Sequence, residues 1–479
     1  MIRRQPPGLR ILLVLLPVLC GSCSQAGELL GEPTKGLAQL QHIQVSFNHR
    51  DDARYRSPLN GRWRNGDNLE QQLIEAIDQA QVECLVAIQE LSLPAIANAL
   101  VRAHQRGVRV QVVLENNYSK AWSQQHEAGL TPHERKRLQR LKRLADRNGD
   151  GVLSAEERLQ GDAIAILARG AVPQIDDTED GSKGSGLMHH KFVVIDRNQV
   201  VTGSANFTSS GLHGDADAPR TRGNVNHLIT VKSPELASLF SQEFERMWGD
   251  GPGGQQNSRF GRAKDAPTIE QVDVGEARIK VLFAPHAKRN SEHGLALIGQ
   301  ELNKAQRSID MALFVFSAQD LTDALRQRVN EGVKVRLLAD PGFASRPFSE
   351  VLDLLGMAMP DRFCKLEAGN NPFQDPLQTV GTPRLARGDK LHHKFAVIDN
   401  KTVITGSFNW SPSAAHTNDE TLLVIHSPKL AAHFTREMNR MWRGAELGIT
   451  ARMRRKLDRQ RVRCGSGWRG AERTREIMT

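Results

Sequence analysis

The stretch "LMHHKFVVID" at residues 187–196 recurs almost unchanged as "LHHKFAVID" at residues 391–399. In each copy, two histidines and a lysine directly precede an apolar run with the β-branched residues typical of a strand. One histidine beside an apolar run is usually a core residue. Two copies, each with a lysine whose burial would be costly, indicate instead that both contribute to a functional site.

Segments on either side of the two copies also match, in the same order in both halves. "RGVRVQVVLEN" (106–116) pairs with "EGVKVRLLAD" (331–340), and "SPELASLFSQEFERMW" (233–248) pairs with "SPKLAAHFTREMNRMW" (427–442). A repeat of this extent predicts a duplicated domain. The predicted divisions are a first half at 40–248, a Gly-, Gln- and Asn-rich linker at 249–277, a second half at 278–445 and a basic tail at 446–479.

The alternation of local patterns indicates the fold class. Short β-branched runs alternate with helical patterns such as "LEQQLIEAIDQA" (69–80) and "SAQDLTDALRQRV" (317–329), where apolar residues recur at intervals of three and four. This rhythm predicts an α/β fold in which each half has one parallel or mixed sheet flanked by helices.

The repeated motif extends beyond the apolar run to a Gly-Ser turn and an asparagine, with identical intervals in both copies. Its residues are His189, Lys191, Asp196 and Asn206 in the first half, and His392, Lys394, Asp399 and Asn409 in the second. Residues two apart on a strand share a face, so each half presents an imidazole and an ammonium group together. The asparagine follows the next β-type run, from which its amide can point back to the same place.

Two imidazoles, two ammonium groups and two amides suit a phosphodiester, because its non-bridging oxygens carry the charge that builds in the transition state. One histidine can attack phosphorus while the other protonates the departing oxygen. This scheme needs no metal, so no cofactor is expected for catalysis.

At these residues the sequence resembles the phospholipase D superfamily, whose signature is the duplicated HxK(x4)D motif with a trailing GSxN. The resemblance covers residues 40–445. It implies two halves packed about a pseudo-twofold axis, one cleft shared by both motifs, and a phosphohistidine intermediate. It further implies His189 as the nucleophile and His392 as the acid, with phosphate held by Lys191, Lys394, Asn206 and Asn409. Asp196 and Asp399 would be structural.

The two copies differ at one position of the family pattern. "TNDETLLVI" carries Glu420, which matches a family acid that orients its histidine, whereas "GNVNHLITV" has Asn226 in that place. An amide can fix the tautomer of an imidazole but cannot stabilise an imidazolium as a carboxylate does. The sequence therefore leaves open which histidine attacks.

The first half carries an insertion, predicted at about 131–169, that contains "DRNGDGVLSAEE" (146–157). Its spacing matches a calcium-binding EF-hand loop, with a glycine at the sixth position. The predicted ligands are Asp146, Asn148, Asp150, Val152 through its carbonyl, Ser154 and Glu157. We expect calcium to brace the insertion rather than take part in catalysis. The alternative is a solvated acidic turn in which Ser154 and Glu157 only cap a helix.

The N-terminus predicts export. Arginines precede a short apolar run, and small residues follow, so residues 1–26 are interpreted as a signal peptide. Cys23 resembles the acylated cysteine of a bacterial lipoprotein, although ordinary cleavage near Ala26 and an uncleaved anchor stay open. The expected location is periplasmic, envelope-bound or secreted. Outside this segment the three cysteines form no metal-spaced cluster, and no disulfide framework is expected.

The formal net charge of +10 favours anionic partners without choosing among them. A phospholipase that releases headgroups is the leading interpretation, with a membrane surface as a partner and a phospholipid as substrate. A metal-independent nuclease is the main alternative, followed by a phosphatidyl transferase and a non-catalytic, calcium-dependent binder of anionic surfaces. No protein partner is inferred, since one chain supplies both motifs. The basic stretch 451–463 is predicted to be helical.

Overall fold

The structure is a computed structural model that describes residues 36–465, except for 182–185, 216–217, 219 and 266. The predicted signal peptide and Cys23 lie outside the described residues. Among the helices that the structure describes, none is long and apolar enough to cross a bilayer.

The first half forms a mixed sheet in the order β1-β9-β8-β7-β4-β5-β6, in which β4, β5 and β6 are parallel neighbours and the other pairs are antiparallel. In chain order its elements are β1 (Ile43–Phe47), β2 (Arg54–Arg56), β3 (Trp63–Asn65), α1 (Leu69–Gln79), β4 (Glu83–Ile88), α2 (Pro94–Gln105), β5 (Arg109–Leu114), η1 (Trp122–Gln124), α3 (Pro132–Ala145), α4 (Ala155–Gly161), α5 (Ala163–Arg169), β6 (Gln174–Asp176), η2 (Glu179–Gly181), β7 (Lys191–Ile195), β8 (Gln199–Gly203), α6 (Ser209–Leu212), β9 (His227–Lys232) and α7 (Pro234–Trp248).

The second half repeats this arrangement in the order β10-β11-β17-β16-β15-β12-β13-β14-β18, with one additional strand at each edge. Its elements are η3 (Gly261–Ala263), β10 (Glu270–Val274), β11 (Ala277–Ala284), α8 (Gly294–Asn303), β12 (Ser308–Leu313), α9 (Gln319–Asn330), β13 (Lys334–Ala339), α10 (Glu350–Leu354), β14 (Val380–Thr382), β15 (Lys394–Ile398), β16 (Thr402–Gly406), α11 (Pro412–His416), β17 (Glu420–His426), α12 (Pro428–Trp442), β18 (Glu446–Leu447) and α13 (Ala451–Cys464). The predicted α/β class with mixed sheets is confirmed.

The additional strands alter two predicted boundaries. The stretch 249–277 is not only a linker, because β10 pairs with β11 along its whole length. The tail is not separate from the second half, because β18 pairs with β14. Backbone pairing cannot be read from composition, which is why the Gly-rich character of 249–267 hid the strand that follows it.

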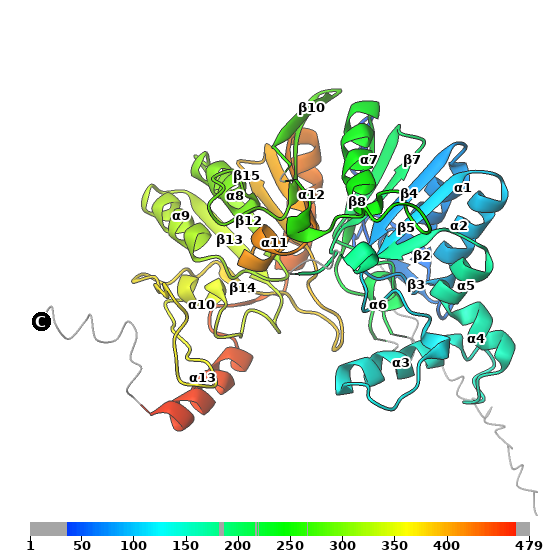
Figure 1. The fold of residues 1–479 in the computed structure, drawn as a ribbon. Coiled ribbons are helices and arrows are strands. Elements are labelled where there is room, and N and C mark those ends of the chain that lie inside the picture. Colours follow the sequence, from blue (N-terminus) through cyan, green and yellow to red (C-terminus); the bar gives the residue numbers. More distant parts are fainter. Residues whose placement is uncertain (1–35, 182–185, 216–217, 219, 266, 466–479) are drawn as a thin grey trace, which may run out of the picture.

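Helices α7 and α12 lie between the two sheets, whereas α1 and α2 cover the outer face of the first sheet and α8 and α9 that of the second (Figure 1). Helices α7 and α12 begin with the same signal, a serine N-cap followed by proline at the first helical position, which is favourable there because its missing N–H is not needed. Their apolar faces meet strands of both halves in one shared core, which includes Phe240, Phe244, Phe395 and Phe434. Burial of these side chains joins the halves into a single unit.

One disulfide corrects the expectation drawn from the cysteine spacing. Cys364, in the loop between α10 and β14, pairs with Cys464 at the end of α13, across a separation of 100 residues. A bridge between such distant residues leaves no local spacing pattern in the sequence. Cys84 is free and buried.

Candidate active site

The two motifs meet where the halves contact each other through backbone hydrogen bonds. The N–H of His189 donates to the carbonyl of Asp419 at 2.9 Å, and the N–H of His392 donates to the carbonyl of Val225 at 3.1 Å. Each catalytic-motif histidine is therefore fixed by a main-chain bond to the opposite half. The histidines lie just before β7 and β15, so equivalent ends of the two sheets face one another.

A cavity of about 650 Å³ opens at this junction and is lined by both halves. His189, His392, Asn206 and Asn409 of the predicted site lie in its wall, together with Asn226. Basic side chains extend the lining outward: Arg137 and Arg140 of α3, and Lys390. The site is thus a single pocket, in which Arg137 and Arg140 form ion pairs with Glu90 and Asp215 of the same lining.

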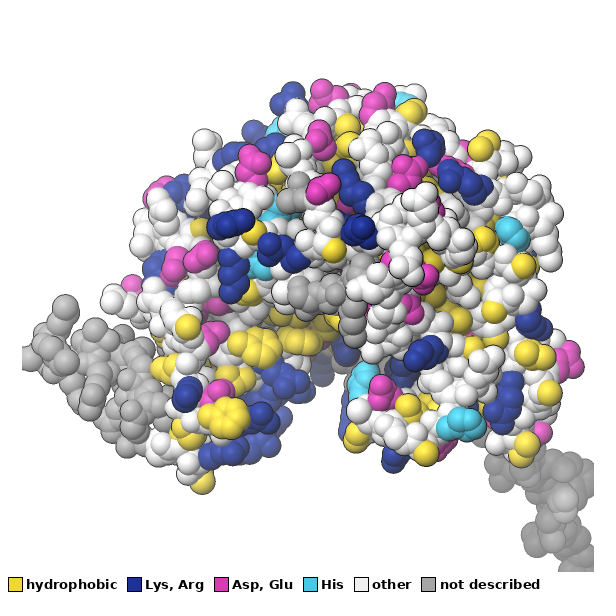
Figure 2. Space-filling model, viewed as in Figure 1, with side chains coloured by type: hydrophobic (Ala, Val, Ile, Leu, Met, Phe, Trp, Pro, Cys, Tyr) yellow, Lys and Arg dark blue, Asp and Glu magenta, His cyan; other side chains and the backbone are white. Residues whose placement is uncertain are grey.

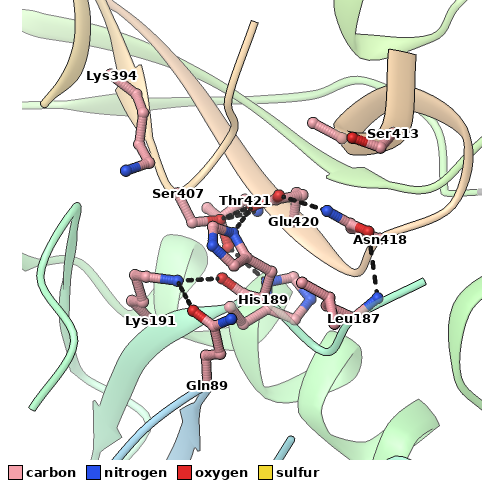
Figure 3. Close-up of polar contacts among 12 residues, drawn as sticks. Gln89, Leu187, His189, Lys191, Lys394, Ser407, Ser413, Asn418, Glu420 and Thr421 are labelled. Atoms are coloured by element: carbon pink, nitrogen blue, oxygen red, sulfur yellow. Dashed lines mark hydrogen bonds and ion pairs between the residues drawn. The ribbon is translucent and has the colours of Figure 1, made fainter. Parts of the chain in front are cut away.

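The partner of His189 comes from the other half. Glu420, at the start of β17, accepts a hydrogen bond from Nδ1 of His189 at 2.7 Å and another from Ser407 Oγ at 2.6 Å (Figure 3). Because Nδ1 carries the hydrogen, Nε2 keeps its lone pair. Glu420 is fully buried, so its charge acts on the imidazole with little screening.

The partner of His392 occupies the equivalent position in the first half but is an amide. Asn226 accepts from Nδ1 of His392 at 2.9 Å and from Ser204 Oγ at 2.8 Å, and its own amide group donates to the Gly211 carbonyl. Each of these two residues therefore contacts the histidine of the opposite half, because the ends of β9 and β17 cross the interface.

The two lysines have different surroundings. Lys191 Nζ donates to the carbonyl of His189 at 2.8 Å and to Gln89 Oε1 at 3.3 Å. Lys394 Nζ donates to the carbonyl of His392 at 2.8 Å and lies 5.0 Å from the centre of the Phe314 ring. Both ammonium groups are buried and close to their histidines.

Gln89 and Phe314 are site residues that the motif did not indicate. Each directly follows a central strand, β4 or β12, and each donates its backbone N–H to the histidine next to the catalytic one, His190 or His393. These residues reach the site because β4 pairs with β7 and β12 pairs with β15. The sequence alone does not show this pairing.

The motif asparagines keep an unused acceptor. The side-chain carbonyl oxygens of Asn206 and Asn409 are buried without a hydrogen-bond partner, and the amide group of Asn206 donates to Gln89 at 3.2 Å. Buried polar atoms without partners are rare in native proteins. The unpaired atoms are acceptors, whereas a phosphate oxygen needs the amide N–H donors of these side chains.

Burial depresses the pKa values of the motif histidines and lysines. The pKa of His189 falls to about 4, with Glu420 opposing the effect and Lys191 adding to it. The pKa of Lys191 falls to about 7. The pKa values of His392 and Lys394 are also well below their ordinary ranges, through burial and the neighbouring cations. Both histidines are therefore neutral in the free protein at pH 7, and a bound anion would draw protons into the site.

Asp196 and Asp399 lie at the opposite ends of β7 and β15 and do not line the cavity. The carboxylate of Asp196 accepts backbone N–H groups of residues 81–83, and that of Asp399 accepts those of residues 306–308. Each anchors the motif strand to the strand beside it.

The second histidine of each motif is also placed away from the cavity. His190 Nε2 contacts Glu243 of α7, and His393 Nε2 contacts Glu437 of α12, both at 3.1 Å. His190, Glu243 and Asp419 are close enough together to hold a metal, but Lys264 forms ion pairs with both carboxylates. An ammonium group in that position makes the cluster a buried ion-pair network.

The predicted calcium loop lies between α3 and α4, at the end of the molecule away from the sheets (Figure 1). Gly151 has φ +79°, as the sharp turn of such a loop requires. The proposed ligands offer only oxygens, which fits calcium. The carboxylates already accept loop N–H groups: Asp146 from Gly149 and Gly151, and Glu157 from Arg147 and Ser154. Helix α5, which lies within the predicted insertion, packs on α2.

Comparisons with known proteins agree with this geometry. The family model described as "Cardiolipin synthase, PLD-like domain" matches residues 73–248 and 298–442. The chain is 30% identical to the mitochondrial cardiolipin hydrolase of Chlamydomonas reinhardtii over 141 residues, 29% of this chain and 54% of that protein. It is 34% identical to a phospholipase D of Rickettsia prowazekii over 162 residues, 34% of this chain and 66% of that protein.

The chain thus spans about half to two thirds of the length of these relatives. The phosphatidylserine synthase of Haemophilus influenzae has the same fold, with a TM-score of 0.52, 12% identity, and coverage of 86% of this chain and 88% of that one. The family match includes both repeated motifs and most of both sheets. The chain belongs to the PLD-like domain family, within the phospholipase D superfamily.

Proposed function

We propose that this protein hydrolyses phospholipids to phosphatidate and a free headgroup alcohol, through a phosphohistidine on His189. The observation that carries the proposal is the unequal pairing of the histidines, with Glu420 on His189 and Asn226 on His392. The names of the cardiolipin hydrolase and phospholipase D relatives support a lipid substrate.

The first step uses the lone pair of His189 Nε2, which attacks phosphorus. The bond from phosphorus to the headgroup oxygen breaks, and that oxygen takes a proton from Nε2 of protonated His392. Attack leaves positive charge on the His189 ring, and Glu420 stabilises it through the Nδ1 hydrogen bond. A carboxylate does this better than an amide, which assigns the nucleophile to His189.

The second step reverses these roles. His392, now neutral, removes a proton from water as the water attacks the phosphohistidine, and the bond from phosphorus to His189 breaks. Phosphatidate leaves with the added oxygen, and His392, which ends protonated, releases this proton when the anionic product departs. Lys191, Lys394, Asn206 and Asn409 hold the non-bridging oxygens throughout, where fixed donors lower the barrier most.

The substrate also brings the acid into the correct protonation state. The pKa of His392 lies well below its ordinary value in the free protein, yet an acid must hold a proton. A phosphodiester anion between the cationic groups raises that pKa. Proton uptake with substrate binding is therefore part of the mechanism.

We further propose export and a structural calcium ion. The Arg-flanked apolar N-terminus supports export, and the Cys364–Cys464 pair supports it independently, because disulfides persist in oxidising compartments. Gly151 and the all-oxygen ligand set support calcium in the loop at 146–157. That loop lies outside the cavity lining, so the ion would stabilise rather than catalyse.

Nucleic-acid cleavage is the second candidate, favoured by the net charge of +10 and by the arginines of α3 in the cavity lining. A side-by-side assay separates the two. The mature protein is incubated, with chelator present, with phosphatidylcholine vesicles, phosphatidylglycerol vesicles, single-stranded DNA and RNA. Headgroup release without strand cleavage is expected, and strand cleavage without headgroup release would overturn the lipid assignment. His189→Asn controls for contaminating activity.

A further inference from the structure

A second cavity of about 660 Å³ lies beside the catalytic one, between the loops at 345–367 and helix α13. Phe348 lies in the wall of both cavities, so they are neighbours across a single side chain. Nothing in the phosphodiesterase motif involves this second cavity. It has no counterpart in the first half, because α13 comes after the repeat.

The lining of this cavity is strongly basic. Six cationic residues contribute to it, against two acids: Arg346, Arg362, Lys365, Lys456, Arg459 and Arg463, with Asp361 and Glu367. Within the described part of the chain, none of the six forms an ion pair with a carboxylate. Asp361 is engaged by the backbone N–H groups of Phe363 and Lys365. The cations are therefore available to an external anion.

The cations also perturb one another. Burial, followed by repulsion from Arg452, Arg346 and Arg459, lowers the pKa of Lys456 to about 8. Like charges held this close destabilise the empty cavity, and an anion between them would relieve the repulsion. Glu367 offsets this charge only in part, because burial raises its pKa to about 7.

The fold holds this basic helix rigidly in place. Met453 of α13 is fully buried in the core of the second half, Lys456 donates to the carbonyl and hydroxyl oxygens of Ser345, and Cys464 is bonded to Cys364. A solvated charged tail would need none of these contacts. Such pre-organisation reduces the entropic cost of binding a ligand.

The surroundings of the cavity combine cations with exposed apolar side chains. Phe363 is 65% exposed, Phe348 43% and Val462 89%. Figure 2 shows Lys and Arg side chains mixed with hydrophobic ones on the arm that α13 forms, and a hollow between this arm and the one formed by α3. Cations next to exposed aromatic and aliphatic groups are typical of segments that lie in a membrane interface.

We propose that this second cavity binds the phosphate of an anionic lipid headgroup and thereby holds the mouth of the catalytic cavity against the bilayer. The lipid bound there is not the one cleaved, because the nucleophile lies in the other cavity. This inference rests on the proposed lipid substrate, but binding at the second cavity is measurable without turnover. It predicts that activity depends on the anionic lipid content of the surface.

The test compares two triple variants of equal charge. The cavity variant removes three cations of the lining, by the substitutions Arg362→Ala, Arg459→Ala and Arg463→Ala. The matched variant removes three exposed cations of α13 that do not line the cavity, by the substitutions Arg454→Ala, Arg455→Ala and Arg461→Ala. Binding is measured by co-sedimentation with phosphatidylcholine vesicles, with and without added phosphatidylglycerol. Melting temperatures confirm that both variants are folded.

The cavity variant should lose about tenfold more affinity for the anionic vesicles than the matched variant, because it loses direct contacts to phosphate in addition to the surface attraction that both variants lose. Both variants should hydrolyse a soluble short-chain phospholipid at the wild-type rate. Equal losses of vesicle affinity in the two variants would overturn binding at the second cavity and indicate diffuse electrostatic attraction instead. A loss of single-stranded DNA affinity with vesicle binding unchanged would overturn the lipid assignment.

The outcomes also separate this inference from the proposed function. Absence of headgroup release on any lipid, with the vesicle-binding difference intact, would refute the hydrolase and leave the docking site. Normal hydrolysis of vesicles by the cavity variant at all anionic lipid contents would refute the docking site alone. A Cys364→Ser, Cys464→Ser double variant provides an independent check and should weaken anionic vesicle binding, because it frees the end of α13.

Discussion

Glu420 Oε2 lies 2.7 Å from Nδ1 of His189, although the two residues belong to different halves of the chain. The mirrored contact pairs His392 with Asn226 at 2.9 Å. The two halves therefore form a symmetric scaffold that differs at one position, which is Glu420 in one half and Asn226 in the other. This difference makes the two histidines chemically unequal. Neither half can orient its own histidine.

Changing Glu420 to glutamine should slow formation of the phosphohistidine. The amide still fixes the tautomer of His189 but no longer stabilises the charged ring, and loss of such a partner typically costs about 10–100-fold. Stopped-flow measurement of the first turnover is the readout. Asn226→Asp is the matched variant, because it places a carboxylate on His392 instead. If Glu420→Gln slowed only the hydrolysis of the intermediate, the nucleophile would be His392.

The two motif histidines should fail differently when each is changed to asparagine. Both variants should lose at least about a hundredfold to ten-thousandfold in turnover. With a substrate whose leaving group needs no protonation, His392→Asn should still accumulate a phosphorylated protein, whereas His189→Asn should not. Mass spectrometry of acid-free digests locates the phosphate. Near wild-type turnover in either variant would contradict a shared site.

Binding of a phosphate analogue should take up protons at pH 7. In the free protein the pKa of His392 is below its ordinary value and that of Lys191 is about 7, so the first is neutral and the second partly so. A bound anion raises both pKa values, and protons move from solvent to protein. Titration calorimetry with vanadate in buffers of different ionisation enthalpy measures the uptake. Lys191→Met should reduce it, and proton release would contradict these protonation states.

The sequence predicted the site residues that belong to the repeated motif. It could not predict the site residues that only sheet pairing and the contact between the halves bring together. The alternation of strand and helix patterns predicted the α/β class, and the duplicated motif led directly to His189, Lys191, His392 and Lys394. Gln89 and Phe314 could not be predicted, because they follow strands far from the motif and reach the site only through sheet pairing. The contacts of Glu420 and Asn226 with the histidines of the opposite half could not be predicted either, because they depend on how the two halves pack.

Reduction of the Cys364–Cys464 bond should destabilise the second half. Closing a loop of 100 residues removes chain entropy from the unfolded state, which in the simplest model stabilises the fold by about 4–5 kcal/mol. The melting temperature should therefore fall in dithiothreitol, as it should in Cys364→Ser. Cys84→Ser is the control and should still respond to reductant. No shift in the wild type on reduction would show that the two cysteines do not pair in solution.

Calcium should stabilise the protein without changing its chemistry. The loop at 146–157 lies between α3 and α4, while the proposed mechanism contains no step that requires a cation. Extracellular calcium modules have dissociation constants of about 10⁻⁴–10⁻³ M, so concentrations a few times higher stabilise by only about 1 kcal/mol. Millimolar calcium should raise the melting temperature slightly in the wild type, but not in Asp150→Ala.

The same loop connects to the cavity through α3, whose Arg137 forms an ion pair with Glu90 at 2.7 Å. Because of this contact, the effect of a chelator on activity tests whether calcium acts on the active site. Below the melting range, a chelator should leave initial rates on a soluble substrate unchanged, because the capping bonds of α3 and α4 hold both helices without the ion. Asp150→Ala should behave like the chelated wild type. Reversible loss of activity on chelation, at a temperature where the fold persists, would show that calcium positions Arg137 and that the ion's role extends to the active site.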